Sequence, residues 1–269
     1  MSDAEWALVR DLLPVPSWTA GRGGRPEGYC HRQMIDAVRY LVDNGIKWRA
    51  MPADFPPWDR VYAFFARRRD MGLVGELHDR LREAVRRVEG RKEEPTAAVV
   101  DSQPVKADAT VTHASRGFDA GKKINGRKRH LLTDTLGLLL AVPVTPTSTT
   151  DLEAARILLP TAKNHFRRLA RIWTDGGCTG HLTDWTSQYL GAVLDIVRRS
   201  DDVQGFQVLP RRWVVERSFA RLLRSRRLVR DDERRTDTSE AVVLWSMTVL
   251  MSRRLTARPQ QPLAPLRAA

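Results

Sequence analysis

The pattern of apolar residues changes at residues 90–95, and this change most constrains how the chain can fold. Before this charged segment, Gly-Arg-Lys-Glu-Glu-Pro, apolar residues recur at the spacing of helices; after it they form short β-branched runs. A chain of 269 residues can bury a sizeable core without disulfides or structural metal. We therefore expect an α/β protein with an all-α N-terminal domain (1–92), a mixed domain (93–256) and a disordered tail (257–269).

The N-terminal part predicts four helices. Ser2 and Glu5 have the spacing of a capping box for a first helix through Leu13, and Gly45 is placed to end the second. A polar, flexible stretch is expected at residues 17–28. The other predicted helices cover residues 31–44, 58–71 and 73–88.

The C-terminal part predicts strands that alternate with helices. Pro104 is expected to stop the first strand, residues 134–137 to form a hairpin turn, and Thr150 with Glu153 to cap a helix through Leu159. The predicted strands cover residues 96–100, 131–133, 138–144, 172–174, 192–197 and 206–209. Further helices are expected at residues 182–190, around residue 216 and at residues 239–254.

The charge of the chain favours a polyanionic partner. Lysine and arginine total 45 against 32 acidic residues, which gives a net charge of +13. Nucleic acid is the leading interpretation, although a ribosomal protein, an anionic membrane surface or plain solubility would also suit this charge. In so basic a chain, the acidic residues need an explanation.

Several other classes of protein are disfavoured. Cys30 and Cys178 lie far apart without paired-ligand spacing, and the six histidines form no close pairs, so a zinc site is not expected. No apolar stretch approaches the roughly 20 residues of a membrane span, and the first residues lack a charged-then-apolar leader. We expect a cytosolic protein with no membrane partner.

Three separated carboxylates stand out. Asp101 and Asp175 each follow an apolar run directly, as if at the end of a buried strand, and Glu216 lies in a helical segment. Acids at strand ends point into a crevice, and only folding could bring the three together. The alternative for each aspartate is an ordinary turn residue, because aspartate favours turns for its own hydrogen bonds.

The helix around Glu216 separates an apolar stripe from a basic face. On a helical wheel, Val215, Phe219, Leu222 and Leu223 form the stripe, while Arg217, Arg221 and Arg224 lie on the other side. Glu216 falls at the seam, where a metal ligand that must approach DNA is expected. The alternative is an ion pair with Arg212, one turn earlier.

Three carboxylates in a basic protein suit phosphodiester cleavage with two magnesium ions, for which manganese may substitute. Oxygen ligands favour these metals over zinc or copper. One metal would activate water or a 3′-hydroxyl as the attacker, and the other would stabilise the leaving oxygen. We therefore take Asp101, Asp175 and Glu216 as candidate catalytic residues and metal ligands.

A dense basic run at residues 121–130 lies between the first two carboxylates. As a loop leading into a hairpin it could hold DNA phosphates, with an affinity that falls steeply with salt. The alternative is a solvated cluster of charges. The candidate DNA-binding residues of the chain are Lys122, Lys123, Arg127, Lys128, Arg129, Arg212, Arg217, Arg221 and Arg224.

Four segments together resemble a known family, the bacterial insertion-sequence transposases of the insertion sequence five group, which carry an Asp-Asp-Glu catalytic triad. The N-terminal segments 3–9 and 44–58 are also similar, so that the resemblance covers residues 2 to about 255. The four segments are Asp101-Ser-Gln-Pro-Val-Lys, Gly121-Lys-Lys-Ile-Asn-Gly-Arg-Lys-Arg-His, Thr174-Asp-Gly-Gly and Gly205-Phe-Gln-Val-Leu-Pro-Arg-Arg-Trp-Val-Val-Glu-Arg-Ser-Phe-Ala.

The resemblance implies a ribonuclease-H-like catalytic domain with Asp101 on its first strand, Asp175 just after its fourth and Glu216 on a later helix. It implies a DNA endonuclease and strand transferase that moves a short DNA element. The N-terminal helices would recognise its terminal inverted repeats. The implied partners are double-stranded DNA at the repeats and at the target, and a second copy or more of the chain, at the nucleoid in the bacterial cytoplasm.

The chain departs from the wider pattern around the triad while keeping all three carboxylates. Leu209 and Leu223 replace the tyrosine and lysine of the signature around the glutamate; Cys178 and Arg221 replace a common tyrosine and tryptophan. Two rival functions stay open: a decayed copy that binds inverted repeats and represses transposition, and a related nuclease without strand transfer. Intact carboxylates favour catalysis, because DNA binding alone would improve without them.

Overall fold

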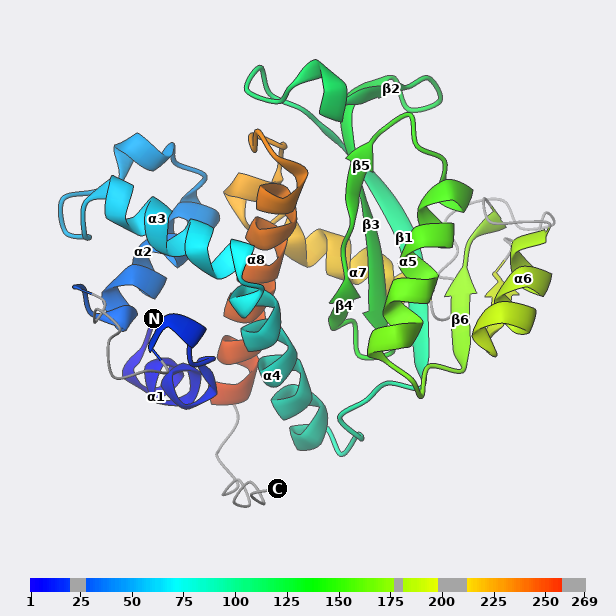
Figure 1. Ribbon diagram of the computed structural model, residues 1–269, viewed down its shortest axis with the longest axis horizontal. Helices are drawn as coiled ribbons and strands as arrows, with labels where there is room; N and C mark the ends of the chain where they lie inside the picture. The colour runs from blue at the N-terminus through cyan, green and yellow to red at the C-terminus, as the bar shows by residue number, and fades with distance from the viewer. Residues whose placement is uncertain (20–27, 177–180, 198–211, 258–269) are drawn as a thin grey trace.

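A bundle of helices and a curled, helix-covered sheet lie side by side in the computed structural model (Figure 1). The structure describes residues 1–19, 28–176, 181–197 and 212–257. The bundle contains the first four α-helices together with the last one, and the sheet carries the remaining helices. Among the described residues, no helix is both long and apolar enough to cross a membrane.

The N-terminal helices form where the sequence predicts them. Ser2 accepts the backbone N–H of Glu5, and the Glu5 side chain returns the bond, which completes the capping box. Gly45 adopts the left-handed conformation at φ 68° and ends the second helix. The elements are α1 (Asp3–Leu12), η1 (Ser17–Thr19), α2 (His31–Asn44), η2 (Trp48–Ala50), α3 (Trp58–Asp70) and α4 (Leu73–Val88).

The sheet is mixed, with the order β2-β3-β1-β6-β7, and β4 and β5 both pair with β3. β3 runs antiparallel to β1, β2, β4 and β5, whereas β1, β6 and β7 run parallel to one another. The strands are β1 (Ala97–Lys106), β2 (Gly117–Asp119), β3 (Ile124–Asp134), β4 (Leu139–Ala141), β5 (Val144–Pro146), β6 (Arg171–Thr174) and β7 (Val193–Ile196).

The first strand is longer than predicted, and the expectation that Pro104 ends it is wrong. Pro104 lies within β1, opposite Lys128 of β3. Among the described residues, β6 pairs with β1 from Ala97 to Val99, and no strand pairs with that edge of β1 at Pro104. Proline has no backbone N–H, and a strand tolerates it where no neighbouring strand would accept a hydrogen bond from that N–H.

The predicted hairpin is present at residues 134–137. The backbone of Asp134 bonds Leu138 and Gly137 across the turn, and its side chain accepts the N–H groups of Leu136 and Leu138. Asp134 also forms a buried ion pair with Arg86 of α4. This acid therefore sets the turn and ties it to the helical bundle.

Helices cover both faces of the sheet. α5 (Asp151–His165), which begins at the predicted capping box of Thr150 and Glu153, packs with α6 (His181–Leu190) on one face. α7 (Arg212–Leu222) packs against β1 and β3 on the other face and contacts α8 (Thr236–Thr256). Two short turns, η3 (His113–Ser115) and η5 (Arg226–Leu228), complete the described elements.

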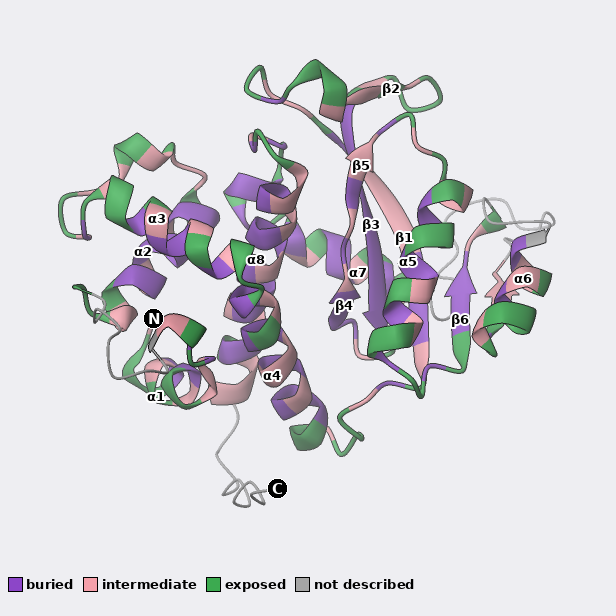
Figure 2. Cartoon of the chain, in the orientation of Figure 1, coloured by how far each residue is buried: buried purple, intermediate pink, exposed green. Residues whose placement is uncertain are grey.

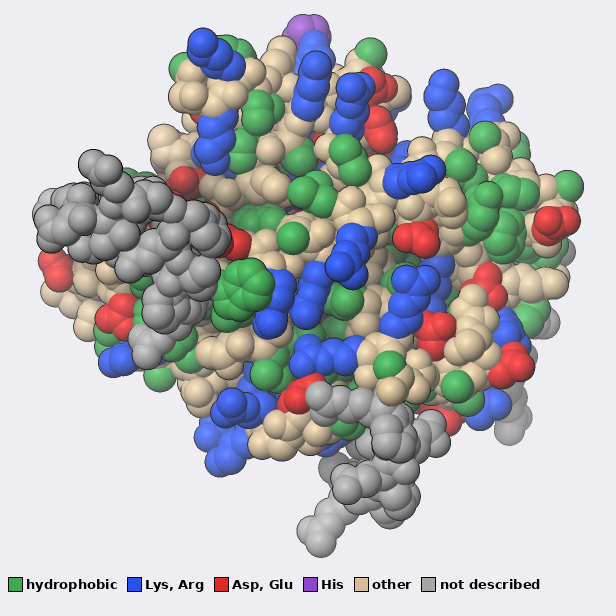
Figure 3. Space-filling model, turned by 180° about the vertical axis from the view of Figure 1, so that it is seen from behind, with side chains coloured by type: hydrophobic (Ala, Val, Ile, Leu, Met, Phe, Trp, Pro, Cys, Tyr) green, Lys and Arg blue, Asp and Glu red, His purple; other side chains and the backbone are tan. Residues whose placement is uncertain are grey.

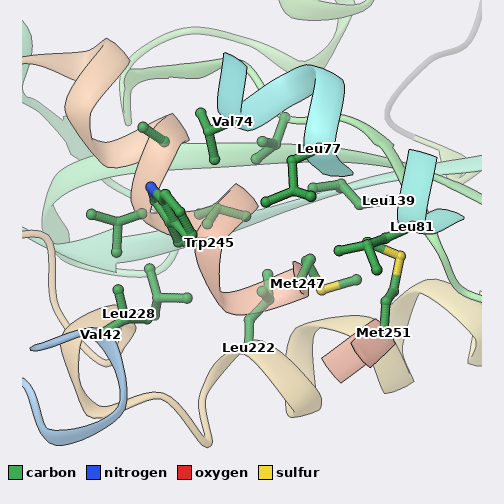
Figure 4. Close-up of a cluster of buried hydrophobic side chains, with 14 of the residues drawn as sticks. Val42, Val74, Leu77, Leu81, Leu139, Leu222, Leu228, Trp245, Met247 and Met251 are labelled. Atoms are coloured by element: carbon green, nitrogen blue, oxygen red, sulfur yellow. The ribbon is translucent and has the colours of Figure 1, made fainter. Parts of the chain in front are cut away.

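One large core joins the bundle to the sheet. Trp245 of α8 packs among side chains from α4, α7 and β4 (Figure 4). Val99 and Trp173, from neighbouring strands, belong to the same core. A second, smaller core lies between the sheet and α5 with α6. The helical bundle and the sheet therefore share buried surface, and the division of the chain at residue 92 stays a prediction.

The strand predicted at residues 206–209 and the tail predicted at residues 257–269, apart from residue 257, lie outside the described residues. So does most of the polar stretch at residues 17–28.

Candidate active site

Asp101 lies within β1, and Asp175 directly follows the neighbouring parallel strand β6. The last pair between β1 and β6 is Val99 with Trp173, and each aspartate follows two residues later. Neighbouring strands lie about 4.8 Å apart. Both aspartates are half-buried and line the same small pocket beside the end of β6. The structure therefore brings these two predicted residues together.

The two faces of the sheet are separated by the alternation of side chains along each strand. Val100 and Ile172 belong to the core under α5, and Ala155 and Leu158 of α5 line the pocket of the two aspartates. Val99 and Trp173 belong to the large core on the face that α7 covers. Asp101, two places after Val99 within β1, continues the row of Val99 on that face.

Glu216 comes from the helix that covers this same face. Its neighbours Val215 and Phe219 are buried in the core that holds Val99 and Trp173, while Glu216 itself is exposed. The seam position predicted for Glu216 is thus present. Glu216 does not line the pocket of the two aspartates. The Arg212 side chain lies outside the described ones, so the alternative ion pair stays open.

The prediction that Leu223 belongs to the apolar stripe around Glu216 is wrong. Leu223 is 39% exposed, because α7 ends at Leu222 and the chain then turns away. Val215, Phe219 and Leu222 are buried as expected.

Three arginines, Arg217 and Arg221 of α7 and Arg224 just after its end, concentrate positive charge at this part of the chain. Arg217 and Arg221 are half-buried, and Arg224 is exposed. Burial, followed by the nearby Arg217, Arg254 and Arg224, lowers the pKa of Arg221. Like charges held this close favour the binding of an anion. Lys and Arg side chains also form a band across the back of the molecule (Figure 3).

The prediction that residues 121–130 form a loop is wrong for most of the segment. Residues from Ile124 onward belong to β3, which is buried along almost all its length (Figure 2). Arg127, Lys128 and Arg129 are 0%, 8% and 1% exposed. These three side chains are not accessible to DNA phosphates, and we remove them from the candidate DNA-binding set.

Each buried cation has partners within the protein. Arg127 forms an ion pair with Asp231 at 3.2 Å and donates to the Ser115 hydroxyl at 2.7 Å. Arg129 donates to the backbone carbonyl of Leu228 at 2.7 Å. Lys128 donates to the carbonyl of Thr149 at 2.9 Å. The cations bind β3 to the segments before α5 and α8, whereas Lys122 and Lys123 precede the strand and are exposed.

Three polar residues of the pocket were missed by sequence reasoning: Ser102, His130 and Asp151. The Ser102 hydroxyl donates to Asp151 at 2.7 Å, and the Ser102 N–H donates to the carboxylate of Asp101 at 2.8 Å. Ser102 therefore links the two acids. In the sequence, Asp151 is an acid in the first turn of a helix, and nothing there distinguishes it from an ordinary helix start.

His130 is neutral in this pocket. Burial, which outweighs the nearby Asp151, lowers the pKa of His130 to about 4. Its Nε2 lies 2.9 Å from the Thr145 hydroxyl. A neutral imidazole adds no positive charge that would compete with a cation for the neighbouring carboxylates.

The donor set at this end of the sheet fits a hard divalent cation in part. Asp101, Asp151 and Asp175 offer carboxylate oxygens, the ligand type that magnesium prefers. Among the described residues, no group of three or more acidic, histidine or cysteine side chains is arranged so that it could hold a metal ion. Two of the three predicted ligands, Asp101 and Asp175, therefore line one pocket, whereas Glu216 lies outside it on α7.

Two family models match the chain. A family of IS4/5 transposases matches residues 1–78, and the transposase DDE domain matches residues 92–253. The second match covers more than half of the chain and carries a ribonuclease-H-like fold, in agreement with the mixed sheet described above. A search of proteins with curated functions found no match. The chain therefore belongs to the IS4/5-type transposases and carries their DDE domain.

Proposed function

We propose that this transposase cleaves DNA at the ends of its element and joins those ends to target DNA, in a reaction that requires a divalent metal. The observation that carries the proposal is that Asp101, on β1, and Asp175, directly after the neighbouring parallel strand β6, line one pocket, with Glu216 on α7, the helix that packs against β1. Such a convergence of acids is unexpected in a chain of net charge +13 unless the acids hold cations.

In this proposal Asp101, Asp175 and Glu216 hold two magnesium ions, or manganese in their place. Bound magnesium would supply Lewis-acid stabilisation of the charge that builds on the phosphate. Ser102 orients Asp101 through its backbone N–H and is itself held by Asp151. Arg217, Arg221 and Arg224 bind the neighbouring DNA phosphates, together with Lys122 and Lys123 at the start of β3.

The partners follow from the reaction. We propose that the N-terminal helices recognise the terminal inverted repeats, and that two copies of the chain pair the two ends. Light scattering of the protein with and without end DNA tests the pairing of two copies. A monomer in both samples would contradict it.

The test replaces each carboxylate by its amide: Asp101→Asn, Asp175→Asn and Glu216→Gln. Each change removes a charge while keeping the shape, so magnesium-dependent cleavage of element-end DNA should fall by more than about 100-fold. End binding, followed by fluorescence anisotropy, should stay equal or become tighter because a negative charge is lost.

The matched control is Asp184→Asn, an exposed acid on α6, which should cleave as the wild type does. Normal cleavage by any one of the three site variants would remove that residue from the site.

The second candidate function is a repressor that binds the inverted repeats without cutting. It is favoured by a single observation, that Glu216 does not share the pocket of the other two acids. Wild-type protein that binds end DNA and fails to cut it in magnesium and in manganese would establish this alternative.

A further inference from the structure

A second cleft, with no residue in common with the pocket of Asp101 and Asp175, lies between the N-terminal helices and the segment that enters α8. It encloses about 950 Å³. One wall comes from the turn after α2, from η2 and from α3; the other comes from the loop after β1 and from residues 227–238. In Figure 1 these segments lie in the upper part of the molecule.

Two aromatic side chains form one wall of this cleft. Trp48 and Tyr62 meet edge to face, with ring centroids 5.1 Å apart. Trp48 is supported from behind by the buried Phe65, at 5.2 Å between centroids. Tyr62 is 40% exposed. The ring of Tyr62 is therefore available to a ligand, and Trp48 holds it in place.

The exposed charged residues of the cleft are cations, one of which, Arg235, pairs with Asp237; the buried cation Arg227 is paired with Glu233. Lys47, Arg234 and Arg235 are exposed, whereas Asp108 and Asp232 are half-buried. Burial raises the pKa of Asp232, as expected for an acid withdrawn from solvent. A ligand that suits this arrangement is anionic where it meets the solvent and carries hydrogen-bond donors and a flat ring farther in.

The walls of the cleft are fixed to each other by polar contacts. Arg227 donates to the carbonyl of Ile46 at 2.6 Å and pairs with Glu233 at 2.7 Å. Across the opposite side, Arg69 of α3 donates to Thr238 of α8 at 2.7 Å. Because both ends are tied, the cleft exists before a ligand arrives, which reduces the entropy lost on binding.

We propose that this cleft binds an unpaired nucleotide of DNA. The base stacks on Tyr62, its N–H donors face Asp108 and Asp232, and the phosphates meet Lys47, Arg234 and Arg235. Stacking on aromatic side chains beside basic groups is how proteins hold single strands. The inference rests on the proposed function only in that the protein must bind DNA; it adds a site for a single strand outside the catalytic pocket.

The experiment compares a short oligothymidylate with a blunt duplex by fluorescence anisotropy. Tyr62→Ala should weaken binding of the single strand by about 5- to 100-fold, as loss of one stacked base does. Tyr62→Phe keeps the ring and should bind as the wild type does. Tyr189→Ala removes a tyrosine that is 72% exposed on α6 and serves as the matched control. Binding of the blunt duplex should stay unchanged in all three variants.

A direct readout uses an iodouracil-substituted single strand, which should crosslink under light to Tyr62 or Trp48. Three results would overturn the inference. These are crosslinks confined to other peptides, an equal loss of single-strand affinity in Tyr62→Ala and Tyr189→Ala, and an equal loss of affinity for the duplex in Tyr62→Ala. Wild-type protein that binds the duplex and not the single strand also overturns it and leaves the proposed function intact, whereas binding to neither DNA contradicts the proposed function. Displacement of the strand by thymidine monophosphate at equal concentration would assign the cleft to free nucleotides instead.

Discussion

Arg127 and Lys122 lie five positions apart in the sequence and have opposite surroundings. The Arg127 side chain is fully buried and paired with the equally buried Asp231, while Lys122 is exposed before the start of β3. Removal of one partner of a buried ion pair leaves the other charge buried without compensation, whereas an exposed lysine contributes little to the stability of the fold. The two residues should therefore respond to mutation in different measurements.

We expect Arg127→Ala to destabilise the protein by about 3–5 kcal/mol, measured by urea unfolding. Lys122→Ala with Lys123→Ala should leave stability within about 0.5 kcal/mol and should reduce the slope of log affinity for DNA against log salt by about one unit for each phosphate that is no longer bound. An unchanged salt slope would show that these lysines do not contact phosphate, and a stable Arg127→Ala protein would contradict the structural role.

Glu240 of α8 gives the stability a dependence on pH. Its carboxylate accepts the N–H of Val144 at 2.9 Å, and burial raises the pKa of Glu240 from 4.5 to about 7. The folded protein then holds a proton that the unfolded chain releases at lower pH. The stabilising contribution is complete below pH 4.5 and is lost as the pH rises through 7.

Glu240→Gln keeps the acceptor for Val144 and removes the titration. Its stability relative to the wild type should therefore rise by about 1–3 kcal/mol between pH 5 and pH 8, as measured by urea unfolding at both values. His130 titrates with the opposite sign, and comparison of the two proteins cancels its effect. A constant difference between wild type and variant would show that Glu240 does not titrate in this range.

At the level of single residues, the sequence correctly predicted that Asp175 directly follows a buried strand, whereas Asp101 lies inside β1 and not at its end; the catalytic role of both stays a prediction. It failed for Arg127, Lys128 and Arg129 because a cluster of charges is normally solvated. Their buried partners come from segments distant in sequence: Asp231 lies 104 positions after Arg127. Nothing local to the basic run reveals such a partner.

Among the elements, β1 and β3 form the longest pairing of the sheet, from Ala98 with Asp134 to Lys106 with Gly126. Gly126 allows a close approach at the end of this pairing. A Cβ atom at Gly126 would lie 1.9 Å from the carbonyl oxygen of Val105, which is backbone and cannot rotate away.

Gly126→Ala should consequently separate β1 from β3 locally and lower the midpoint of thermal unfolding, with a loss of about 2–4 kcal/mol. The matched control is Gly75→Ala in α4, where a Cβ meets nothing within 4 Å. That change should stabilise the protein by about 0.5–1 kcal/mol, since alanine is the better helix residue. Equal stability of the two variants would contradict the close approach.

Helices were predicted more closely than strands. The bounds of α2 and α4 agree with the periodicity because each helix presents one apolar face and ends at a clear signal. The lengths of β1 and β3 were underestimated, since the polar second half of β1 and the polar first half of β3 have no apolar alternation and depend on each other for pairing. Charged residues in β3 are stabilised by tertiary ion pairs, which override local preference.

On the scale of the whole molecule, α8 joins the two ends of the chain. It packs against α1, α2, α3 and α4, and its Trp245 is 1% exposed in the core that also holds β4 and α7 (Figure 4). The boundary predicted near residue 92 divides the helical spacing of apolar residues from the strand-like spacing. It cannot reveal that the last helix completes the bundle of the first four.

We expect the bundle and the sheet to unfold in a single transition. Trp245→Ala should cost about 3–5 kcal/mol, and hydrogen exchange should show equal loss of protection in α4 and in β3. Phe118→Ala, which changes a side chain that is 57% exposed on β2, is the control. Loss of protection in α4 alone would show that the two parts unfold independently.

The position of α8 has a consequence during synthesis. A ribosome that has completed α4 must add 147 residues, 89–235, before α8 begins. At a synthesis rate of about 5–20 residues per second, the apolar faces of the early helices remain unpacked by α8 for roughly 7–30 s. We therefore expect the nascent chain to be a substrate for chaperones throughout that interval. A chain truncated before α8 should form no stable helical bundle and so should not compete with the full-length protein.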